Sequence, residues 1–337
     1  MKIGVVGAGG WGTALADLLA RAGHDVVLWC FEPEVARAIE IRRENETYLP
    51  GISLSDNIKP TTGIDEAVSG REIVVSVSPS HVVRGVMGSA AAFMNPSAIV
   101  LSASKGIEND TLLTMSQVLK DVLGDNMPIA VLSGPSFALE VARGHPTAVS
   151  VASEIEDVVL LIQRTFSNKR FRVYAGDDVI GLELGGSIKN VIAIAAGIGD
   201  GMGYGTNTRA ALITRGLAEM TRLATKMGAH PLTMAGLGGL GDLVLTCTGD
   251  LSRNRQVGLK IGSGLKLSQI LAEMRMVAEG IKTTRSAYDL AQREEVEMPI
   301  VEAVYRILYE DKNPKDAVFE LMTRDLKREI DTYAPSV

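Results

Sequence analysis

The chain has 337 residues, of which 46% are hydrophobic and 22% charged, so it is long enough for two domains with sizeable cores. Its net charge of −6 argues against a nucleic-acid partner or binding to an anionic membrane, because both favour a basic surface. The start MKIGVVGAGG lacks the apolar stretch of a secretory signal, and no run of about 18 uncharged apolar residues predicts a membrane span. We therefore expect a cytoplasmic protein without membrane insertion.

The cysteines and histidines give no sign of a metal site. Cys30 and Cys247 lie far apart without a C-x-x-C spacing, and the four histidines are scattered without an H-E-x-x-H motif. We expect two buried free thiols and no bound metal.

A glycine-rich turn follows the first predicted strand, which runs from Lys2 to Val6, and helical spacing begins at Thr13. The turn has the pattern G-x-G-x-x-G and contains Gly7, Gly9, Gly10, Trp11 and Gly12. Glycines at this spacing let the backbone approach a pyrophosphate, whose charge then lies at the helix N-terminus. Between a strand and a helix, the motif predicts dinucleotide binding.

The second predicted strand, Asp25–Trp29, is followed by Phe31 and Glu32. An acidic residue about 20 positions after the glycine motif binds the ribose 2′-hydroxyl of NAD, whereas a nearby Arg accommodates the 2′-phosphate of NADP. Glu32 favours NAD, and Phe31 could lie against the adenine. Arg42 and Arg43 on the next helix leave NADP open, so the local signal favours NAD only weakly.

Five further apolar runs predict the rest of a mostly parallel sheet. They are 73–77, 98–102, 128–132, 148–152 and 171–174. Ligands bind beyond the carboxyl ends of such strands, where Ser78, Lys105 and the segment 133–136 lie. Turn chemistry explains the serines, glycines and proline equally well. Lys105 is better explained as a contact to an anion or a hydroxyl group.

From Val179 onward, strand-like runs disappear and helical patterns dominate. The predicted helices span 179–198, 207–227, 267–275, 280–293, 299–309 and 314–331. The glycine-dense segment 197–205 is expected to end the first of them. We therefore predict an α/β Rossmann domain over residues 1–177 and an all-α substrate-binding domain over 178–337, with a frayed tail at 334–337.

Lys189 stands in the middle of the first of these helices, in the sequence ELGGSIKNVIAIAAG. A Lys buried among Leu, Ile, Val and Ala has a lowered pKa, because burial disfavours the ammonium form, and it can accept a proton near neutral pH. The alternative is that Lys189 extends to the surface and only its methylene stem is covered.

Two polar groups follow in the helical half. Asp242 comes after a glycine-rich turn, and Thr246 lies four residues later on the same helix face, although Asp242 could equally be an N-cap. Ser252, Arg253 and Asn254 stand at the start of another predicted helix. Together they could bind a phosphate, or they could form an ordinary capped helix with a solvated Arg.

Six motifs in order resemble those of the bacterial-type NAD(P)-dependent glycerol-3-phosphate dehydrogenases. They are GAGGWGTALA, LSASKGIE, LSGPSFALEV, ELGGSIKNVIAIAAGIGDG, GLGGLGDLVLTCTGDLSRNR and VAEGIKTT. The resemblance spans nearly the whole chain. It implies a Rossmann domain followed by a helical domain, and reversible hydride transfer between NAD(P)H and dihydroxyacetone phosphate, which gives sn-glycerol 3-phosphate.

The resemblance also implies roles for individual residues. Lys189 matches the proton acceptor, Lys105 a contact to substrate and cofactor, and Asp242 an acid that orients the two lysines. The other implied substrate contacts are Gly134, Ser136, Ser252, Arg253 and Asn254. Asn190 and Thr246 are further candidates beside them. Besides the glycine turn, Phe31, Glu32, Lys105 and Arg253, the implied cofactor contacts are Tyr48, Ala138, Val277 and Glu279.

Two positions depart from the family pattern. Gly10 stands where a Ser is common, a change that we expect to cost only a side-chain donor, and Phe31 stands where many members have an Arg, which again favours NAD. The resemblance further implies a role in phospholipid synthesis and the possibility of a homodimer.

Two alternative functions are open at this point. Another two-domain dehydrogenase of the β-hydroxyacid type would share the fold, but its carboxylate substrate would not require the predicted phosphate site at 252–254. A non-catalytic nucleotide-sensing module would retain the glycine turn, but it would not need Lys105, Lys189 and Asp242 together.

Overall fold

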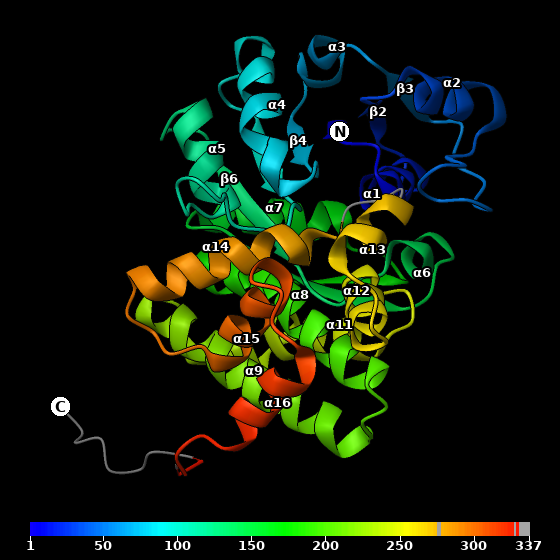
Figure 1. Cartoon of the computed structure of the whole chain (residues 1–337). Coiled ribbons are helices and arrows are strands. Elements are labelled where there is room, and N and C mark those ends of the chain that lie inside the picture. Colours follow the sequence, from blue (N-terminus) through cyan, green and yellow to red (C-terminus); the bar gives the residue numbers. More distant parts are fainter. Residues whose placement is uncertain (275–277, 327, 330–337) are drawn as a thin grey trace.

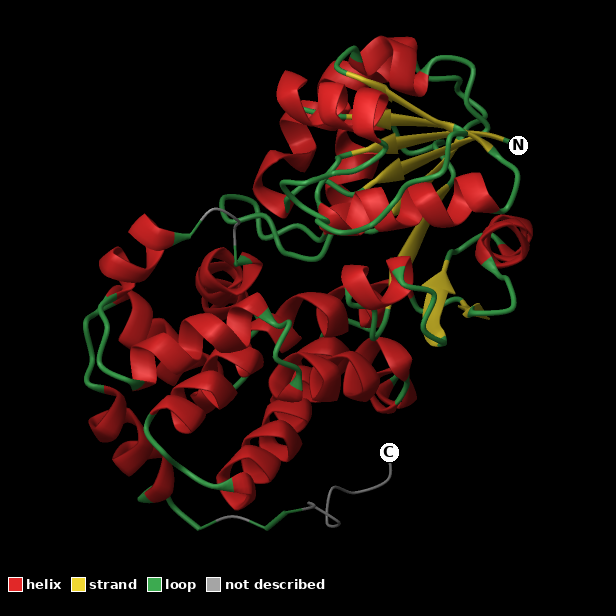
Figure 2. Cartoon of the chain, turned by 90° about the vertical axis from the view of Figure 1, so that its right-hand side faces the viewer, coloured by secondary structure: helices red, strands yellow, loops and turns green. Residues whose placement is uncertain are grey.

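The computed structural model describes residues 1–274, 278–326 and 328–329. A sheet flanked by helices forms the N-terminal half, and a group of helices forms the C-terminal half (Figures 1 and 2). The predicted fold class is confirmed.

The described residues of the N-terminal half form a sheet of eight strands, in the order β3-β2-β1-β4-β5-β6-β7-β8. All neighbouring strands are parallel except β6 and β7. The strands are β1 (Lys2–Val6), β2 (Asp25–Trp29), β3 (Ile58–Thr61), β4 (Ile73–Ser76), β5 (Ile99–Ser102), β6 (Ile129–Ser133), β7 (Thr147–Ala152) and β8 (Phe171–Gly176).

Helices cover both faces of this sheet, which is why the central strands are continuous apolar runs. Side chains of α1, α2, α6 and α7 pack on one face, and those of α3, α4 and α5 pack on the other. These helices are α1 (Gly10–Arg21), α2 (Pro33–Arg42), α3 (Ile64–Val68), α4 (Val83–Ala90), α5 (Met115–Leu123), α6 (Ala138–Ala142) and α7 (Glu156–Phe166). Two short 3₁₀ turns, η1 (Ser80–Val82) and η2 (Ala91–Phe93), flank α4.

One strand, β3, was not predicted from the sequence. This strand has only four residues, includes Pro60 and lies at the edge of the sheet, where a missing N–H is tolerated. Its pairing with β2 depends on tertiary contact, and its local sequence has little strand character.

The C-terminal half is built around α8 (Val179–Gly201), whose residues from Gly181 to Gly199 are buried. The helix is long and apolar enough to cross a membrane, but 83% of its most apolar window is buried inside the protein. The surrounding elements are α9 (Thr206–Lys226), α10 (Pro231–Ala235), the π-helical turn η3 (Leu237–Gly241), α11 (Asp242–Thr248), α12 (Arg253–Gly262), α13 (Leu267–Glu273), α14 (Glu279–Arg293), α15 (Pro299–Tyr309) and α16 (Pro314–Met322). They include α9, α11, α12 and α14, which pack directly on α8.

As expected, α8 ends within the glycine-dense segment 197–205, although it continues three residues beyond the predicted end, to Gly201. A Cβ on Gly197 would lie 2.1 Å from the carbonyl oxygen of Arg255, and one on Gly201 would lie 2.2 Å from that of Leu259. The glycines therefore let α12 approach the helix closely. This tertiary packing outweighs the low helix propensity of glycine, which is about 1 kcal/mol per residue below that of alanine.

The last predicted helix is shorter than expected, because α16 ends at Met322 instead of residue 331. Leu326 is fully exposed, so it does not contribute a buried face that would extend the helix. Residue 275, at the end of another predicted helix, and the tail 334–337 lie outside the described residues.

Candidate active site

The glycine turn between β1 and α1 has the geometry that a dinucleotide requires. Gly7 has a φ of +127°, and a Cβ on Gly12 would lie 1.9 Å from the carbonyl oxygen of Gly7. No side chain caps the N-terminus of α1, so its free N–H groups are available to an anion. The residues present therefore fit the pyrophosphate of NAD or NADP.

Gly10 does more in this turn than omit a hydroxyl group. A Cβ at this position would lie 2.7 Å from the carbonyl oxygen of Tyr48, which real Cβ atoms essentially never do. The expectation that Ser would differ only by a donor is therefore wrong, because Gly10 also provides room for the loop that contains Tyr48. Trp11, the next residue, is half-buried and packs on the core of this half.

At the end of β2, Glu32 and Tyr48 hold each other in place. The Tyr48 hydroxyl donates to Oε1 of Glu32 over 2.7 Å, and burial together with this contact raises the pKa of Tyr48 to about 12. The Phe31 side chain is 75% exposed and contacts Trp29 edge to face. This places an acid and an exposed ring where the adenosine of a dinucleotide is expected.

The two arginines that could favour NADP have other partners. Arg42 forms an ion pair with Glu46. Arg43 donates to the carbonyl oxygen of Ile58 and lies 3.4 Å from a carboxylate oxygen of Asp56.

Asp242 brings together the two lysines that the sequence analysis singled out. Lys189 Nζ donates to Oδ1 of Asp242 over 2.5 Å, and Lys105 Nζ donates to Oδ2 over 2.7 Å. Lys189 also donates to Thr246 Oγ1 over 2.9 Å, and Lys105 to the carbonyl oxygen of Gly134 over 3.2 Å. Three segments far apart in the sequence thus meet at one carboxylate, and Lys105 joins them to the loop at Gly134.

Lys189 is 6% exposed, so it does not extend to the surface. Burial lowers its pKa to about 8, and the Lys105 charge adds to that shift, whereas the Asp242 carboxylate opposes it. A pKa of about 8 allows both the ammonium and the amine to be populated near neutral pH.

Asp242 does not act as an N-cap. It is the first residue of α11, follows η3 directly, and is 1% exposed. Thr246, one turn later, donates back to the carbonyl oxygen of Asp242 over 2.6 Å, so its Oγ1 is fixed as the acceptor for Lys189. The expectation that Asp242 and Thr246 face the same side is therefore confirmed.

The loop after β6 lies against α8 beside this cluster. Gly134 has a φ of +144°, and Ser136 Oγ donates to its carbonyl oxygen over 3.0 Å. A Cβ on Gly186 of α8 would lie 2.6 Å from Ser133 Oγ and 3.6 Å from a stem carbon of Lys105. Ala138, the first residue of α6, lies near the glycine turn, 3.8 Å from where a Cβ on Gly10 would be.

The segment 252–254 combines a capped helix with an exposed cation. Ser252 Oγ accepts from the N–H of Arg255, and the Asn254 amide joins Asn190 to the N–H of Gly280. The Arg253 side chain is exposed, and among the described residues it has no ion pair within 4.0 Å. Ser252 and Asn254 therefore have structural partners here, whereas Arg253 can bind a ligand anion.

Ser80 contacts a predicted site residue, Glu279, but was not itself predicted from the sequence. Its Oγ donates to Oε2 of Glu279 over 2.7 Å, which connects the end of β4 to α14. Burial raises the pKa of Glu279, while Ser80 and the charge of Arg253 oppose that shift. The position of Ser80 just beyond the carboxyl end of a predicted strand was the signal that could have identified it as a site residue. Val277, predicted nearby, lies outside the described residues.

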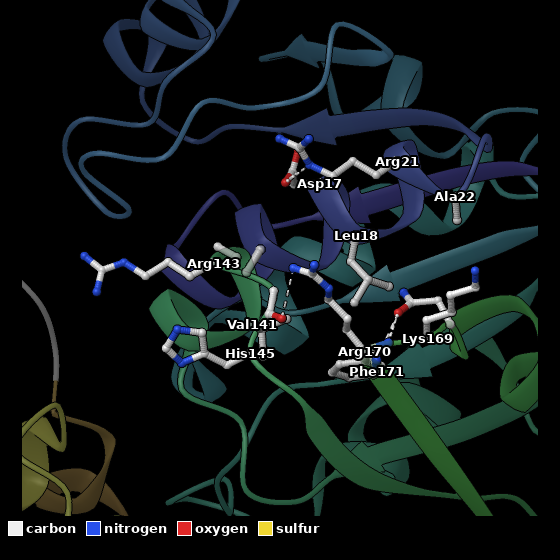
Figure 3. A pocket seen from close by; sticks show the side chains of 14 residues that line it. Asp17, Leu18, Arg21, Ala22, Val141, Arg143, His145, Lys169, Arg170 and Phe171 are labelled. Atoms are coloured by element: carbon white, nitrogen blue, oxygen red, sulfur yellow. Dashed lines mark hydrogen bonds and ion pairs between the residues drawn. The ribbon is translucent and has the colours of Figure 1, made fainter.

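A separate cavity of about 560 Å³ lies on the Rossmann half, between α1, α6 and the turn before β8 (Figure 3). Apolar side chains such as Leu18 line it, together with the cations Arg143, Lys169 and Arg170. Figure 3 shows Arg143 and Lys169 extending away from each other, so these cations do not converge on one ligand position. The residues of the lysine cluster are absent from its lining.

Two sequence models of known domains match this chain. The model described as NAD-dependent glycerol-3-phosphate dehydrogenase N-terminus matches residues 2–159, and the one described as its C-terminus matches residues 178–319. The chain belongs to the NAD-dependent glycerol-3-phosphate dehydrogenase family. It is therefore an oxidoreductase, and the resemblance stated from its motifs is confirmed.

Individual glycerol-3-phosphate dehydrogenases match over nearly the full length. A glycerol-3-phosphate dehydrogenase [NAD(P)+] of Citrifermentans bemidjiense is 58% identical over 97% of this chain and 98% of its own. The enzyme of Geobacter sulfurreducens is also 58% identical, over the same shares. The crystal structure of glycerol-3-phosphate dehydrogenase from Coxiella burnetii has a TM-score of 0.93 and 40% identity, covering 96% of this chain and 99% of that one.

A ketopantoate reductase from Ralstonia eutropha is similar in fold alone. Its TM-score is 0.59 at 18% identity, covering 94% of this chain and all of its own. The two-domain architecture is therefore shared with the alternative dehydrogenase class, and it does not distinguish that class from the glycerol-3-phosphate dehydrogenases.

Proposed function

We propose that this enzyme interconverts dihydroxyacetone phosphate and sn-glycerol 3-phosphate with NAD(P)H, and that Lys189 moves the proton. The observation that carries the proposal is the buried Lys189 amine, fixed by Asp242 and Thr246 beside a second lysine. When bound, the nicotinamide cofactor supplies or accepts the hydride at C2.

In the oxidative direction, the neutral Lys189 amine accepts the proton of the C2 hydroxyl as the carbonyl forms. In the reductive direction, the Lys189 ammonium returns a proton to the carbonyl oxygen. Lys105 provides a second positive charge that stabilises negative charge on that oxygen. Asp242 keeps both nitrogens oriented, and it prevents their mutual repulsion from separating them.

The glycine turn would hold the pyrophosphate, and Glu32 would accept from the adenosine ribose. We propose that NAD is preferred over NADP. Glu32 would repel a 2′-phosphate, and Arg42 and Arg43 are engaged elsewhere. Further candidate cofactor contacts are Ala138 at the start of α6, Ser80 after β4 and Glu279 at the start of α14.

We propose that Arg253 binds the substrate phosphate, with Asn190 and Asn254 holding the backbone around it. Gly134 and Ser136 would contact the substrate from the same side as Lys105. We further propose a division between the domains near residue 177. A cytoplasmic location, a role in phospholipid synthesis and a homodimer are predictions that follow from the family resemblance.

An initial-rate assay tests the function directly. We expect dihydroxyacetone phosphate to drive the oxidation of NADH, with a higher kcat/KM for NADH than for NADPH. Turnover of 2-ketopantoate without turnover of dihydroxyacetone phosphate would instead favour the β-hydroxyacid alternative.

A further inference from the structure

The buried carboxylate of Glu183 has no role in the chemistry described so far. Glu183 is on α8, six residues before Lys189, and is 6% exposed. It crosses to the Rossmann half, where Oε1 accepts from the Ser116 N–H over 2.7 Å and Oε2 accepts from Ser116 Oγ over 2.6 Å. Its carboxyl group therefore lies at the N-terminus of α5, where the helix dipole favours a negative group.

The start of α5 is also the end of the loop that presents Lys105. This loop runs from the end of β5 at Ser102 to Thr114, and its two sides are joined by a bridge between Ile107 and Thr114. Ile107 is 3% exposed and belongs to the apolar core of the helical half. The loop is therefore held against the helical half at Ile107, and α5, which follows the loop directly, is held there at Ser116.

Holding this loop matters because Lys105 comes from the Rossmann half, whereas Lys189 and Asp242 come from the helical half. A displacement of about 1 Å in such a reacting group can reduce the rate about 10²-fold. Gly106, next to Lys105, lies close to both halves, since a Cβ there would lie 2.4 Å from Ser80 Oγ of the Rossmann half and 3.8 Å from Glu279 Oε2 of the helical half.

We propose that Glu183 is a positioning residue that locks the Lys105 loop onto the helix carrying Lys189, so that both lysines meet Asp242. This inference rests on the proposed roles of the two lysines. It assigns a function to an interdomain contact that touches neither substrate nor cofactor.

The structure provides a matched control in Glu219. This carboxylate on α9 is 2% exposed and accepts from the N–H groups of Ile300 and Val301 at the start of α15. Like Glu183, it is a buried acid at a helix N-terminus, and burial raises the pKa of both. Its hydrogen bonds to described residues lie within the helical half, so its removal should destabilise the protein without moving Lys105.

The test compares Glu183→Ala, Glu183→Gln and Glu219→Ala in the full-length enzyme, by kcat, by the Kd for NADH and by thermal unfolding. We expect Glu183→Ala to reduce kcat at least tenfold and to leave the Kd for NADH within about threefold. Glu183→Gln should recover most of the lost kcat, because an amide can accept from the Ser116 N–H and donate to its hydroxyl. Glu219→Ala should lower the melting temperature and keep a near-normal kcat.

A pH profile adds a readout that a purely structural role would not change. Lys105 lowers the pKa of Lys189, whereas Asp242 raises it. If Glu183→Ala displaces Lys105, the limb of the pH–rate profile that depends on Lys189 should move to higher pH. Lys105→Met should cause the same shift, and Glu219→Ala should not.

Equal losses of kcat in the two alanine variants, or a wild-type kcat in Glu183→Ala, would overturn the proposal. If Glu183→Ala does not fold, Ser116→Ala serves instead. It keeps the N–H donor, and it should lower kcat without weakening NADH binding, while an unchanged kcat would count against the proposal. A Lys189→Ala enzyme that keeps its turnover would overturn the proposed chemistry itself, and the positioning role with it. A Lys189→Ala enzyme without turnover, beside a fully active Glu183→Ala, would reject the positioning role alone.

Discussion

Lys189 Nζ lies 2.5 Å from Oδ1 of Asp242, although 53 residues separate them and both side chains are buried. The other oxygen of the same carboxylate accepts from Lys105, which belongs to the other half of the protein. One negative charge therefore faces two positive ones. The net positive charge that results is suited to stabilising negative charge on a substrate oxygen.

Replacing Lys189 by Ala should abolish most turnover, because the proton then has no acceptor at C2. General acid–base groups contribute about 10²- to 10⁴-fold to rates, so we expect a loss of kcat in that range. The Kd for NADH, measured by fluorescence, should change little, because the hydrogen bonds of Lys189 go to Asp242 and Thr246 and not to the residues proposed to hold the pyrophosphate and ribose. Turnover within about tenfold of wild type would reject the assignment.

The pH dependence should differ in sign between the two directions. Lys189 has a pKa of about 8. Oxidation of glycerol 3-phosphate needs the neutral amine, so its kcat/KM should rise as the pH passes through about 8. Reduction of dihydroxyacetone phosphate needs the ammonium, so its kcat/KM should fall over the same interval. Initial rates between pH 6 and pH 10 measure both limbs, and limbs of the same sign would contradict the scheme.

Asp242→Asn should move the Lys189-dependent limbs of both kcat/KM–pH profiles to lower pH. The Asp242 charge raises the pKa of Lys189, so its removal leaves burial and Lys105 to lower that pKa further. The rate should also fall, because the two lysines then repel each other without a carboxylate between them. The same pH series measures the shift, and a limb at higher pH would show that Asp242 acts differently.

Arg253→Ala should raise the KM for dihydroxyacetone phosphate much more than the KM for NADH. A bidentate Arg–phosphate contact is charge-assisted and contributes about 1.5–3 kcal/mol, or roughly 10- to 150-fold. Arg143→Ala is a suitable control, because Arg143 is also exposed but lines the separate cavity. Equal effects on both Michaelis constants would argue against the phosphate assignment.

Glu32→Gln should narrow the preference for NADH over NADPH. The substitution removes the charge that would repel a 2′-phosphate but keeps an acceptor for the Tyr48 hydroxyl. Glu34→Gln, a change at an exposed position in the first turn of α2, is the matched control. The ratio of kcat/KM values for the two cofactors measures the effect, and an unchanged ratio in Glu32→Gln would place the selectivity elsewhere.

Some of these features could be predicted because their signals are local. The glycine turn depends on backbone freedom within six residues, and the strand ends and apolar helix faces follow from short periodic patterns. Lys189 could be singled out because a cation in an apolar helix is costly, and Asp242 and Thr246 because a spacing of four places residues on one helix face.

Other features depended on contacts between distant segments. The strand at 58–61 forms because β2 offers it an edge, and α8 continues past Gly197 because α12 packs against its glycines. Nothing near Glu183 in the sequence indicates that its carboxylate accepts hydrogen bonds from Ser116. The sequence by itself determined which residues can carry charge, turn sharply or bury an apolar face. The tertiary structure decided which of them meet, because the pairing energy of buried charges depends on separations that only the folded chain defines.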